Sequence, residues 1–380
     1  MCYSTIESYI NKIGFLQGMR RHISKRIVIH VGFSCNERCV FCYYRDSLAR
    51  GDVKDLTLEQ IKKRLRIGRK FGKNEVDLSG GEPTIRKDIF EIIRYAKKIG
   101  YKTVSIITNG LMLAKKEFCE KLVDAGLNDI LFSLHGPDKE MHDYLTSVKG
   151  SYDKLMKGMD YMSELGINLR INTVISNLNY KQLDKYFLLV KKFNPNAINL
   201  LIFNPAEEAI NYKTDDVTVE NYSLIGEELV KALDKHSKNF NKINIRFLPF
   251  CLVKGHEDKI KTMWQKIYER EEWDPFLFMR FRKNDWYAYS FPFAGFFIAL
   301  FKYKYYKVPY TGKKSFYTYF CELIQSARIY YNKRHAPGCK NCSLKEICPG
   351  LPKAYIKKFK KAEVFPYEGK KITDPSHFDE

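Results

Sequence analysis

Three cysteines near the start of the chain are the residues best suited to metal or redox chemistry. Cys35, Cys39 and Cys42 are separated by three and then two residues, and they follow an apolar stretch. A loop with this spacing can hold three corners of a cubic [4Fe–4S] cluster. No fourth cysteine follows closely, so one iron would stay open to a reacting ligand. A zinc knuckle or a chance spacing is the alternative for the triplet alone.

A second motif follows the next apolar segment. Residues 74–79 are predicted to form a strand, and Gly80, Gly81, Glu82 and Pro83 come directly after it. Two glycines allow a backbone to approach a ligand closely, and a glutamate supplies a negative charge for an ammonium group. An ordinary tight turn is the alternative for the two glycines.

The two motifs together resemble the radical S-adenosylmethionine (radical SAM) superfamily. The resemblance rests on the cysteine spacing, on Phe41 before the last cysteine and on the strand that ends in Gly-Gly-Glu-Pro, and it covers about residues 26–204. It implies that SAM chelates the open iron, that Phe41 lies near the adenine, and that Gly80, Gly81 and Glu82 hold the methionine amino group. It also implies that a cluster reduced by ferredoxin or flavodoxin cleaves SAM to a 5′-deoxyadenosyl radical, which activates a C–H bond.

Alternating strands and helices are expected to position these motifs. Such a series implies parallel strands with right-handed crossovers, and six units are too few for a closed eight-stranded barrel. The predicted fold class is α/β: an open (β/α)6 partial TIM barrel, as the resemblance also implies, with a C-terminal auxiliary-cluster extension. Strands are predicted at residues 26–33, 74–79, 103–108, 129–134, 168–175 and 197–203, with 242–249 as a further candidate, and helices at 57–71, 87–99, 115–125, 152–165, 180–193 and 219–236.

Active residues of a parallel barrel lie at the C-terminal ends of its strands. Thr108 and Asn109 end the third predicted strand, and Ser133 and His135 end the fourth. By position, Thr108 and Asn109 are predicted to contact the cofactor, and the resemblance makes Ser133 a contact of the SAM ribose. An ordinary strand serine is the alternative for Ser133, and His135 is a candidate to face substrate or to be structural.

A charged residue is predicted inside the barrel. Arg170 and Asn172 lie one side-chain period apart on the fifth strand and so share a face. Burying a charge there is costly unless it is paired. Arg170 is therefore a candidate to bind the SAM carboxylate, and a salt bridge at the strand entrance is the alternative.

A second group of cysteines lies near the C-terminus. Cys339, Cys342 and Cys348 are spaced by two and then five residues. This spacing resembles part of the SPASM or twitch extensions of radical SAM enzymes, which hold auxiliary [4Fe–4S] clusters, although proline stands where SPASM has a further cysteine. We predict one auxiliary [4Fe–4S] cluster held by these three residues and Cys251. Zinc is the rival metal, because four cysteines also form structural zinc sites, and Cys321 is the alternative to Cys251.

The stretch between these cysteines is rich in aromatic and basic residues. Residues 276–320 contain 19 aromatic side chains in 45 positions. The uncharged segment 286–301 is short for a membrane span, but its flanking cations suit an anionic membrane surface. A core-forming lid over the active site is the alternative, and a single-stranded nucleic-acid surface is disfavoured.

Composition and length set the class of protein. The 380 residues are 45% hydrophobic, which predicts one large globular domain with an appendage, and the net charge of +21 favours anionic partners or a solvated lysine-rich surface. Residues 1–20 lack a signal-peptide pattern, and ten cysteines in such a chain indicate metal binding, so a cytoplasmic, low-oxygen setting with optional peripheral membrane contact is expected. The predicted domains are a lead-in at 1–24, the barrel at 25–240 and the auxiliary-cluster domain at 241–380.

Three functions fit these observations. The first is radical SAM modification of a peptide or protein side chain, because the extension resembles those of peptide-maturing enzymes. The second is radical modification of a lipid or isoprenoid at a membrane, motivated by residues 276–320. The third is a non-catalytic iron–sulfur or zinc protein, which the Gly-Gly-Glu-Pro motif argues against because a scaffold has no need of an amino-group clamp.

Overall fold

The computed structural model describes the barrel and parts of the C-terminal region. The described residues are 22–42, 44, 54–203, 221–262, 266–267, 333–352, 355–356, 363–374 and 376–378. The predicted lead-in up to residue 21, the aromatic segment 276–320 and Cys321 lie outside them. No helix within the described ranges has the length and apolar character needed to cross a membrane.

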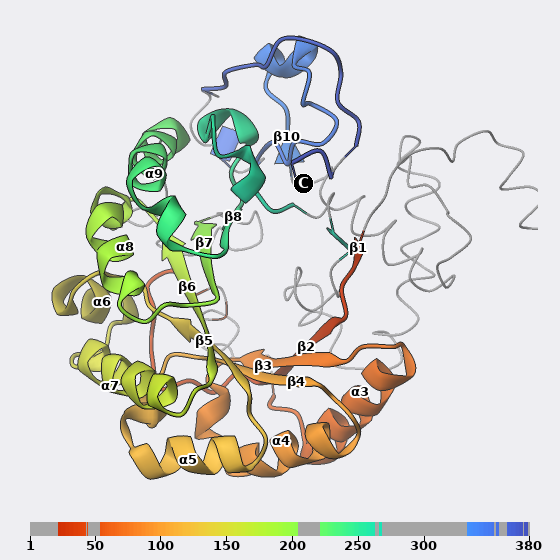
Figure 1. Cartoon of the computed structure of the whole chain (residues 1–380), viewed down its shortest axis with the longest axis vertical. Helices are drawn as coiled ribbons and strands as arrows, with labels where there is room; N and C mark the ends of the chain where they lie inside the picture. The colour runs from red at the N-terminus through yellow and green to blue at the C-terminus, as the bar shows by residue number, and fades with distance from the viewer. Residues whose placement is uncertain are drawn as a thin grey trace, which may run out of the picture.

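The centre of the molecule is a parallel seven-stranded sheet whose spatial order follows the chain. Figure 1 shows it as an open, curved sheet with the helices on its convex side. The six predicted strands are confirmed, and the candidate strand near residue 245 joins them as the seventh, so the sheet extends beyond the predicted domain boundary at residue 240. The strands are β2 (Arg26–Gly32), β3 (Glu75–Gly80), β4 (Thr103–Thr108), β5 (Asp129–Ser133), β6 (Asn168–Ile175), β7 (Ala197–Ile202) and β8 (Ile243–Arg246).

Helices follow the strands in the order expected for β-α units. The Thr57 side chain accepts the Gln60 N–H and the Gln60 side chain accepts the Thr57 N–H, so a capping box begins the first of them. One eight-residue helix, α6, was not predicted. The helices are α3 (Leu58–Lys70), α4 (Ile89–Lys98), α5 (Lys116–Asp124), α6 (Lys139–Thr146), α7 (Ser151–Glu164), α8 (Leu183–Lys191) and α9 (Tyr222–His236).

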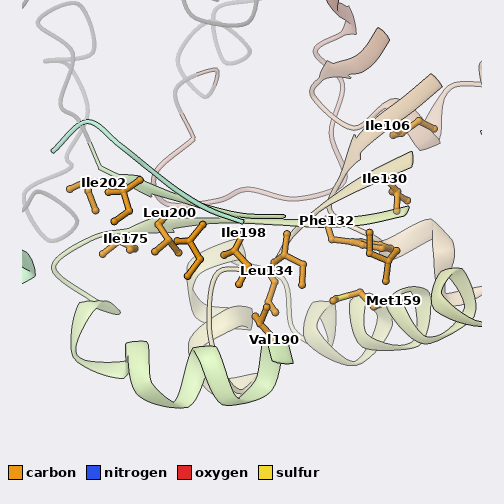
Figure 2. Close-up of a cluster of buried hydrophobic side chains, with 14 of the residues drawn as sticks. Ile106, Ile130, Phe132, Leu134, Met159, Ile175, Val190, Ile198, Leu200 and Ile202 are labelled. Atoms are coloured by element: carbon orange, nitrogen blue, oxygen red, sulfur yellow. The ribbon is translucent and has the colours of Figure 1, made fainter. Parts of the chain in front are cut away.

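The hydrophobic core lies between the sheet and these helices. Alternate strand residues such as Ile130 and Phe132 on β5 are fully buried and pack with Met159 of α7 and Val190 of α8 (Figure 2). Because neighbouring strand residues point to opposite faces, the residues between them face the concave interior. On β5 these are Asp129, Leu131 and Ser133, so the interior wall carries polar groups.

The C-terminal region packs near the β8 and α9 end of the barrel (Figure 1). The ring of Tyr355 meets that of Tyr222 at the start of α9 with a centroid separation of 4.5 Å. A short antiparallel pair joins β10 (Lys333–Arg334) to β11 (Leu351–Pro352), and a parallel pair joins β1 (His22–Ile23) to β9 (Lys266–Ile267). These contacts make the C-terminal region an addition to the barrel rather than a remote module.

Candidate active site

The loop that carries Cys35, Cys39 and Cys42 is docked on the helix that the sequence did not reveal. The N–H groups of Arg38 and Val40 donate to the carbonyls of Thr146 and Leu145 at 3.0 and 2.9 Å. Those carbonyls belong to the last turn of α6, where a helix has unpaired acceptors. Helix α6 therefore holds the middle of the cysteine loop in place.

Two charged residues missed by sequence reasoning hold the start of this loop. The Asp55 carboxylate accepts the Phe33 N–H at 2.7 Å and the Ser34 hydroxyl at 3.2 Å. Arg86 donates to the carbonyl of Val31 at 2.9 Å. Neither residue lies in a motif with recognisable spacing, so only the folded chain shows that they brace the end of β2.

Gly80 and Gly81 are required by close contact with the cysteine loop. A Cβ atom on Gly80 would lie 2.0 Å from the carbonyl oxygen of Gly32, and one on Gly81 would lie 2.2 Å from that of Ser34. The Gly81 N–H also donates to the Gly32 carbonyl at 2.9 Å, and the Glu82 N–H donates to the Ser34 carbonyl at 2.8 Å. The close approach predicted for these glycines is thus made, in the first instance, to the strand that leads into the cysteines.

The Glu82 carboxylate joins the end of β3 to the end of β4. It is 3% exposed, and Oε1 accepts the Thr84 N–H, the Thr84 hydroxyl and the Thr108 hydroxyl at 3.0, 2.6 and 2.8 Å. Oε2 accepts the Asn109 N–H at 2.7 Å, which leaves it one further acceptor position. Burial raises the pKa of Glu82, although these hydrogen bonds oppose the shift. An ammonium group would therefore reach this carboxylate through Oε2.

Thr108 and Asn109 serve the site differently from the prediction. The Thr108 hydroxyl is buried, donates to Glu82 and accepts the Gly110 N–H at 3.1 Å, so it supports the site instead of facing a cofactor. The Asn109 amide donates to Asn36 Oδ1 at 2.7 Å and lies 3.9 Å from the sulfur of Cys35. Asn109 therefore connects the end of β4 to the cysteine loop.

The three cysteines are half-buried, and their surroundings suit metal ligation. Burial raises the pKa of Cys35 to about 12, and the carboxylates of Glu82 and Glu37 add to the shift. Burial also raises the pKa of Cys39 well above its usual value, and the neighbouring Cys35 and Cys42 contribute. Thiols in this setting become thiolates only with a strong positive partner, which bound iron supplies. Three sulfurs that lie close together on one loop therefore fit three corners of a [4Fe–4S] cluster.

Phe41 and the end of β5 lie beside this loop. The rings of Phe41 and His135 meet edge to face with a centroid separation of 4.6 Å. Ser133, the last residue of β5, is half-buried and pairs in register with Asn172 on β6. Phe41 and Ser133 thus occupy the C-terminal end of the barrel, where the sequence placed them.

Arg170 does not lie with these residues. Its Nη2 donates to Asp77 at 2.9 Å, and its Nε donates to Asp129 at 2.7 Å. Burial alone would raise the pKa of Asp77, but Arg170 and Arg26 outweigh it and hold the pKa below its usual value. These residues occupy the N-terminal halves of their strands, away from the cysteine loop. The assignment of Arg170 to the SAM carboxylate was wrong, because its guanidinium is used in a buried salt bridge at the strand entrance.

The four C-terminal cysteines of the predicted auxiliary site line a common cavity. They are Cys251, Cys339, Cys342 and Cys348, and His335 lines the cavity with them. The Gly350 N–H donates to the sulfur of Cys348 at 3.4 Å, and the Tyr367 N–H donates to the sulfur of Cys342 at 3.4 Å. Burial raises the pKa of Cys348 to about 12. N–H donors to buried sulfurs are the contacts that tune iron–sulfur clusters, so this donor set fits such a group.

Across the described residues, no three His, Cys, Asp or Glu side chains converge in the way that a single metal ion requires. Cys119 is apart from both groups: it is buried in α5, and its thiol donates to the Leu113 carbonyl at 3.2 Å.

Comparison with known proteins agrees with this arrangement. Residues 29–190 match the family model described as the Radical SAM superfamily. This region of the chain is similar to the radical SAM superfamily. The matched region contains the cysteine loop, the Gly-Gly-Glu-Pro segment and the ends of β4 and β5.

The curated relatives share mainly this domain. The chain is 35% identical over 173 residues to a "Probable GTP 3',8-cyclase" of Saccharolobus solfataricus, which covers 45% of this chain and 54% of that relative. It is 33% identical over 209 residues to a protein of the same name from Sulfolobus acidocaldarius, which covers 54% and 65%. The chain thus spans about half to two thirds of the length of the curated relatives it matches.

Solved structures show more distant likeness. Streptococcus suis SuiB has 19% sequence identity and a TM-score of 0.49, with 63% of this chain and 51% of that one covered. A methylornithine synthase has 18% identity and a TM-score of 0.46, with 60% and 65% covered. At this level of similarity the two structures carry no information about the substrate.

Proposed function

We propose that the protein is a radical SAM enzyme whose cluster is held by Cys35, Cys39 and Cys42. The observation that carries the proposal is the hydrogen-bonded path from Glu82 through Asn109 to the cysteine loop. This path fixes the Gly-Gly-Glu-Pro segment against the cysteines at the C-terminal end of a parallel barrel, where such folds place their active residues. When bound, a [4Fe–4S] cluster supplies the electron that cleaves SAM to a 5′-deoxyadenosyl radical.

The chain's own residues have distinct parts in this function. Phe41 is proposed to pack on the adenine, and Ser133 to bond the ribose. Glu82 Oε2, with one acceptor position left, and the backbone of Gly80 and Gly81 are proposed to receive the methionine amino group. The half-buried setting limits the contact of water with the sulfurs, which favours one-electron chemistry over hydrolysis. Such an enzyme needs an external electron donor, and ferredoxin or flavodoxin is the expected kind.

We further propose an auxiliary [4Fe–4S] cluster on Cys251, Cys339, Cys342 and Cys348. Its support is the shared cavity and the N–H donors to the sulfurs. A chain with both clusters should contain about eight iron atoms after anaerobic reconstitution. Cys348→Ala should reduce this to about four, whereas Cys119→Ala, a buried cysteine outside both groups, should not change it. About four irons together with one zinc in the unaltered protein would contradict the auxiliary cluster.

A peptide or protein side chain is the proposed substrate, because the C-terminal cysteines resemble the extensions of peptide-maturing enzymes. A purine nucleotide is the second candidate, since the relatives named above are called GTP 3',8-cyclases. The lipid substrate and membrane surface depended on residues 276–320, which lie outside the described residues.

A direct assay tests the proposal. Reconstituted protein given dithionite and SAM should release 5′-deoxyadenosine, and Cys39→Ala should abolish the release. GTP and candidate precursor peptides are then added in separate reactions. Mass spectrometry should show which of them exchanges hydrogen for deuterium or changes in mass. Reduced, iron-loaded protein that leaves SAM intact would refute the function.

A further inference from the structure

His135 is a buried imidazole at the active-site end of the barrel, and one of its ring nitrogens makes no hydrogen bond to a described residue. It follows β5, is 4% exposed, and its ring contacts that of Phe41 at a centroid separation of 4.6 Å. None of the roles proposed above uses this side chain. Its position, two residues after Ser133, puts it in the same strand-end layer as the residues proposed to bind SAM.

The backbone of His135 is fixed on both sides. Its N–H donates to Nδ1 of His142 on α6 at 3.2 Å, and its carbonyl accepts the Asn179 amide at 2.9 Å. The rings of His135 and His142 stack with a centroid separation of 6.1 Å. The imidazole is therefore held in one place rather than free to change rotamer.

The hydrogen bonds of the ring determine its tautomer. Nδ1 of His135 accepts the backbone N–H of Val174 on β6 at 3.2 Å, so the proton of the neutral ring is on Nε2. Burial lowers the pKa of His135 well below its usual value, and the adjacent His142 adds to this. His135 is thus a neutral donor with its N–H on Nε2.

This donor is not consumed within the part of the chain that the structure describes. His135 Nε2 makes no hydrogen bond to a described residue. Some polar side-chain atoms of the described residues are fully buried and lack a hydrogen-bond partner; Nε2 of His142 is one of them, and Nε2 of His135 is not. The two neighbouring histidines therefore differ: Nε2 of His142 is fully enclosed by protein, whereas Nε2 of His135, on a ring that contacts Phe41, is not.

We propose that His135 Nε2–H donates a hydrogen bond to an acceptor on the adenosyl half of SAM. The proposal rests on the proposed function, which places the nucleoside against Phe41. A neutral donor suits this position because SAM carries a positive sulfonium, and an imidazolium nearby would repel it. The fixed tautomer means that the donor is already oriented before SAM binds, so little ordering cost opposes the contact.

Two substitutions distinguish the proposed donor role of Nε2 from the structural role of Nδ1. In His135→Asn the amide oxygen can replace Nδ1 as acceptor for Val174, but the donor at the Nε2 position is lost. In His135→Gln the longer amide can restore that donor. We expect His135→Asn to bind SAM about tenfold more weakly, the effect of one hydrogen bond, and His135→Gln to stay within about threefold of the unaltered protein.

The measurement is equilibrium dialysis of SAM, 5′-deoxyadenosine and methionine with reconstituted, oxidised holoenzyme. The loss should appear for SAM and 5′-deoxyadenosine and not for methionine. His256→Asn, at an imidazole bonded to Asp234 far along the chain, is the matched control. Equal iron content and melting temperature show that the variants are folded.

The outcomes are separable from those of the proposed function. Unaltered protein that binds no SAM would refute the function itself. Unaltered protein that binds SAM while His135→Asn binds it equally well would overturn only the role of His135. A loss for methionine alone would overturn it too, because the donor would then serve the other half of the cofactor.

Discussion

Glu82 Oε2 accepts the backbone N–H of Asn109 at 2.7 Å, and this bond unites the ends of two neighbouring strands. The same Asn109 then reaches the cysteine loop through Asn36. One buried carboxylate thus determines where the β3 end, the β4 end and the cysteines lie relative to one another. The geometry of the site depends on this contact before any ligand binds.

Replacement of Glu82 by Gln should therefore weaken both the fold and cofactor binding. The amide keeps one acceptor oxygen but turns an NH₂ group toward the remaining donors, which leaves a buried N–H without an acceptor. The expected loss in the free energy of unfolding is about 2 kcal/mol, measured by urea denaturation, with weaker SAM binding in the reconstituted protein. Glu91→Gln, which removes an exposed ion pair with Lys62, is the control and should change stability by less than about 0.5 kcal/mol.

Gly81→Ala should displace the cysteine loop. The added Cβ would lie 2.2 Å from the Ser34 carbonyl oxygen, and a backbone atom cannot move aside as a side chain can. We expect a loss of about 2–3 kcal/mol in stability and a lower iron content after reconstitution. Gly166→Ala tests the alternative cause: Gly166 has a φ of +70° and nothing within 4 Å of the added atom, so it reports backbone strain alone, about 1 kcal/mol. Normal iron loading in Gly81→Ala would contradict the packing argument.

Local sequence signals predicted the parts of the fold that depend on local physics. The pattern Thr57-x-x-Gln60 is a local signal, and it forms a capping box at the start of α3; the six predicted strands are all present. Helix α6 was not predicted because eight residues show too little periodicity to distinguish a helix from a loop. Its N-terminus is capped by a single side chain, that of Asp138. Its importance lies in a long-range contact with Arg38 that no local pattern records.

The site residues divide in the same way. Cys35, Cys39 and Cys42 were found because a metal cluster needs fixed ligand types at a short spacing. Asp55 was missed because it acts through space, on backbone N–H groups more than twenty positions earlier. Arg170 was misassigned because the sequence indicates that a charge is buried in the barrel but does not show which groups pair with it. Its carboxylate partners lie 41 and 93 residues away.

Arg170→Met tests this correction. Removal of the guanidinium breaks the ion pair with Asp129 and takes one of two cationic partners from Asp77, so the variant should lose about 3 kcal/mol of stability. SAM affinity of the folded fraction should be unchanged, because the salt bridge lies at the opposite end of the strands from the cysteines. Equilibrium dialysis below the melting temperature distinguishes the two roles. A tenfold loss of SAM affinity in an otherwise stable variant would restore the original assignment.

The buried histidines His135 and His142 should make the free energy of unfolding depend on pH. Burial lowers the pKa of His142 to about 4, from an ordinary value of 6.5, and the pKa of His135 falls as well. The unfolded chain therefore binds more protons than the folded chain between pH 6.5 and 4. Stability is complete above pH 6.5 and decreases as the pH falls through this window, by roughly 2–4 kcal/mol for His142.

Urea denaturation of the metal-free protein at intervals from pH 7.5 to 4.5 measures this dependence. His142→Asn keeps an acceptor for the His135 N–H but cannot be protonated, so its stability should be lower at pH 7 and should change less with pH. His256→Asn, which affects a histidine whose partner Asp234 is exposed, should retain the full slope. A slope in His142→Asn equal to that of the unaltered protein would show that other groups cause the acid sensitivity.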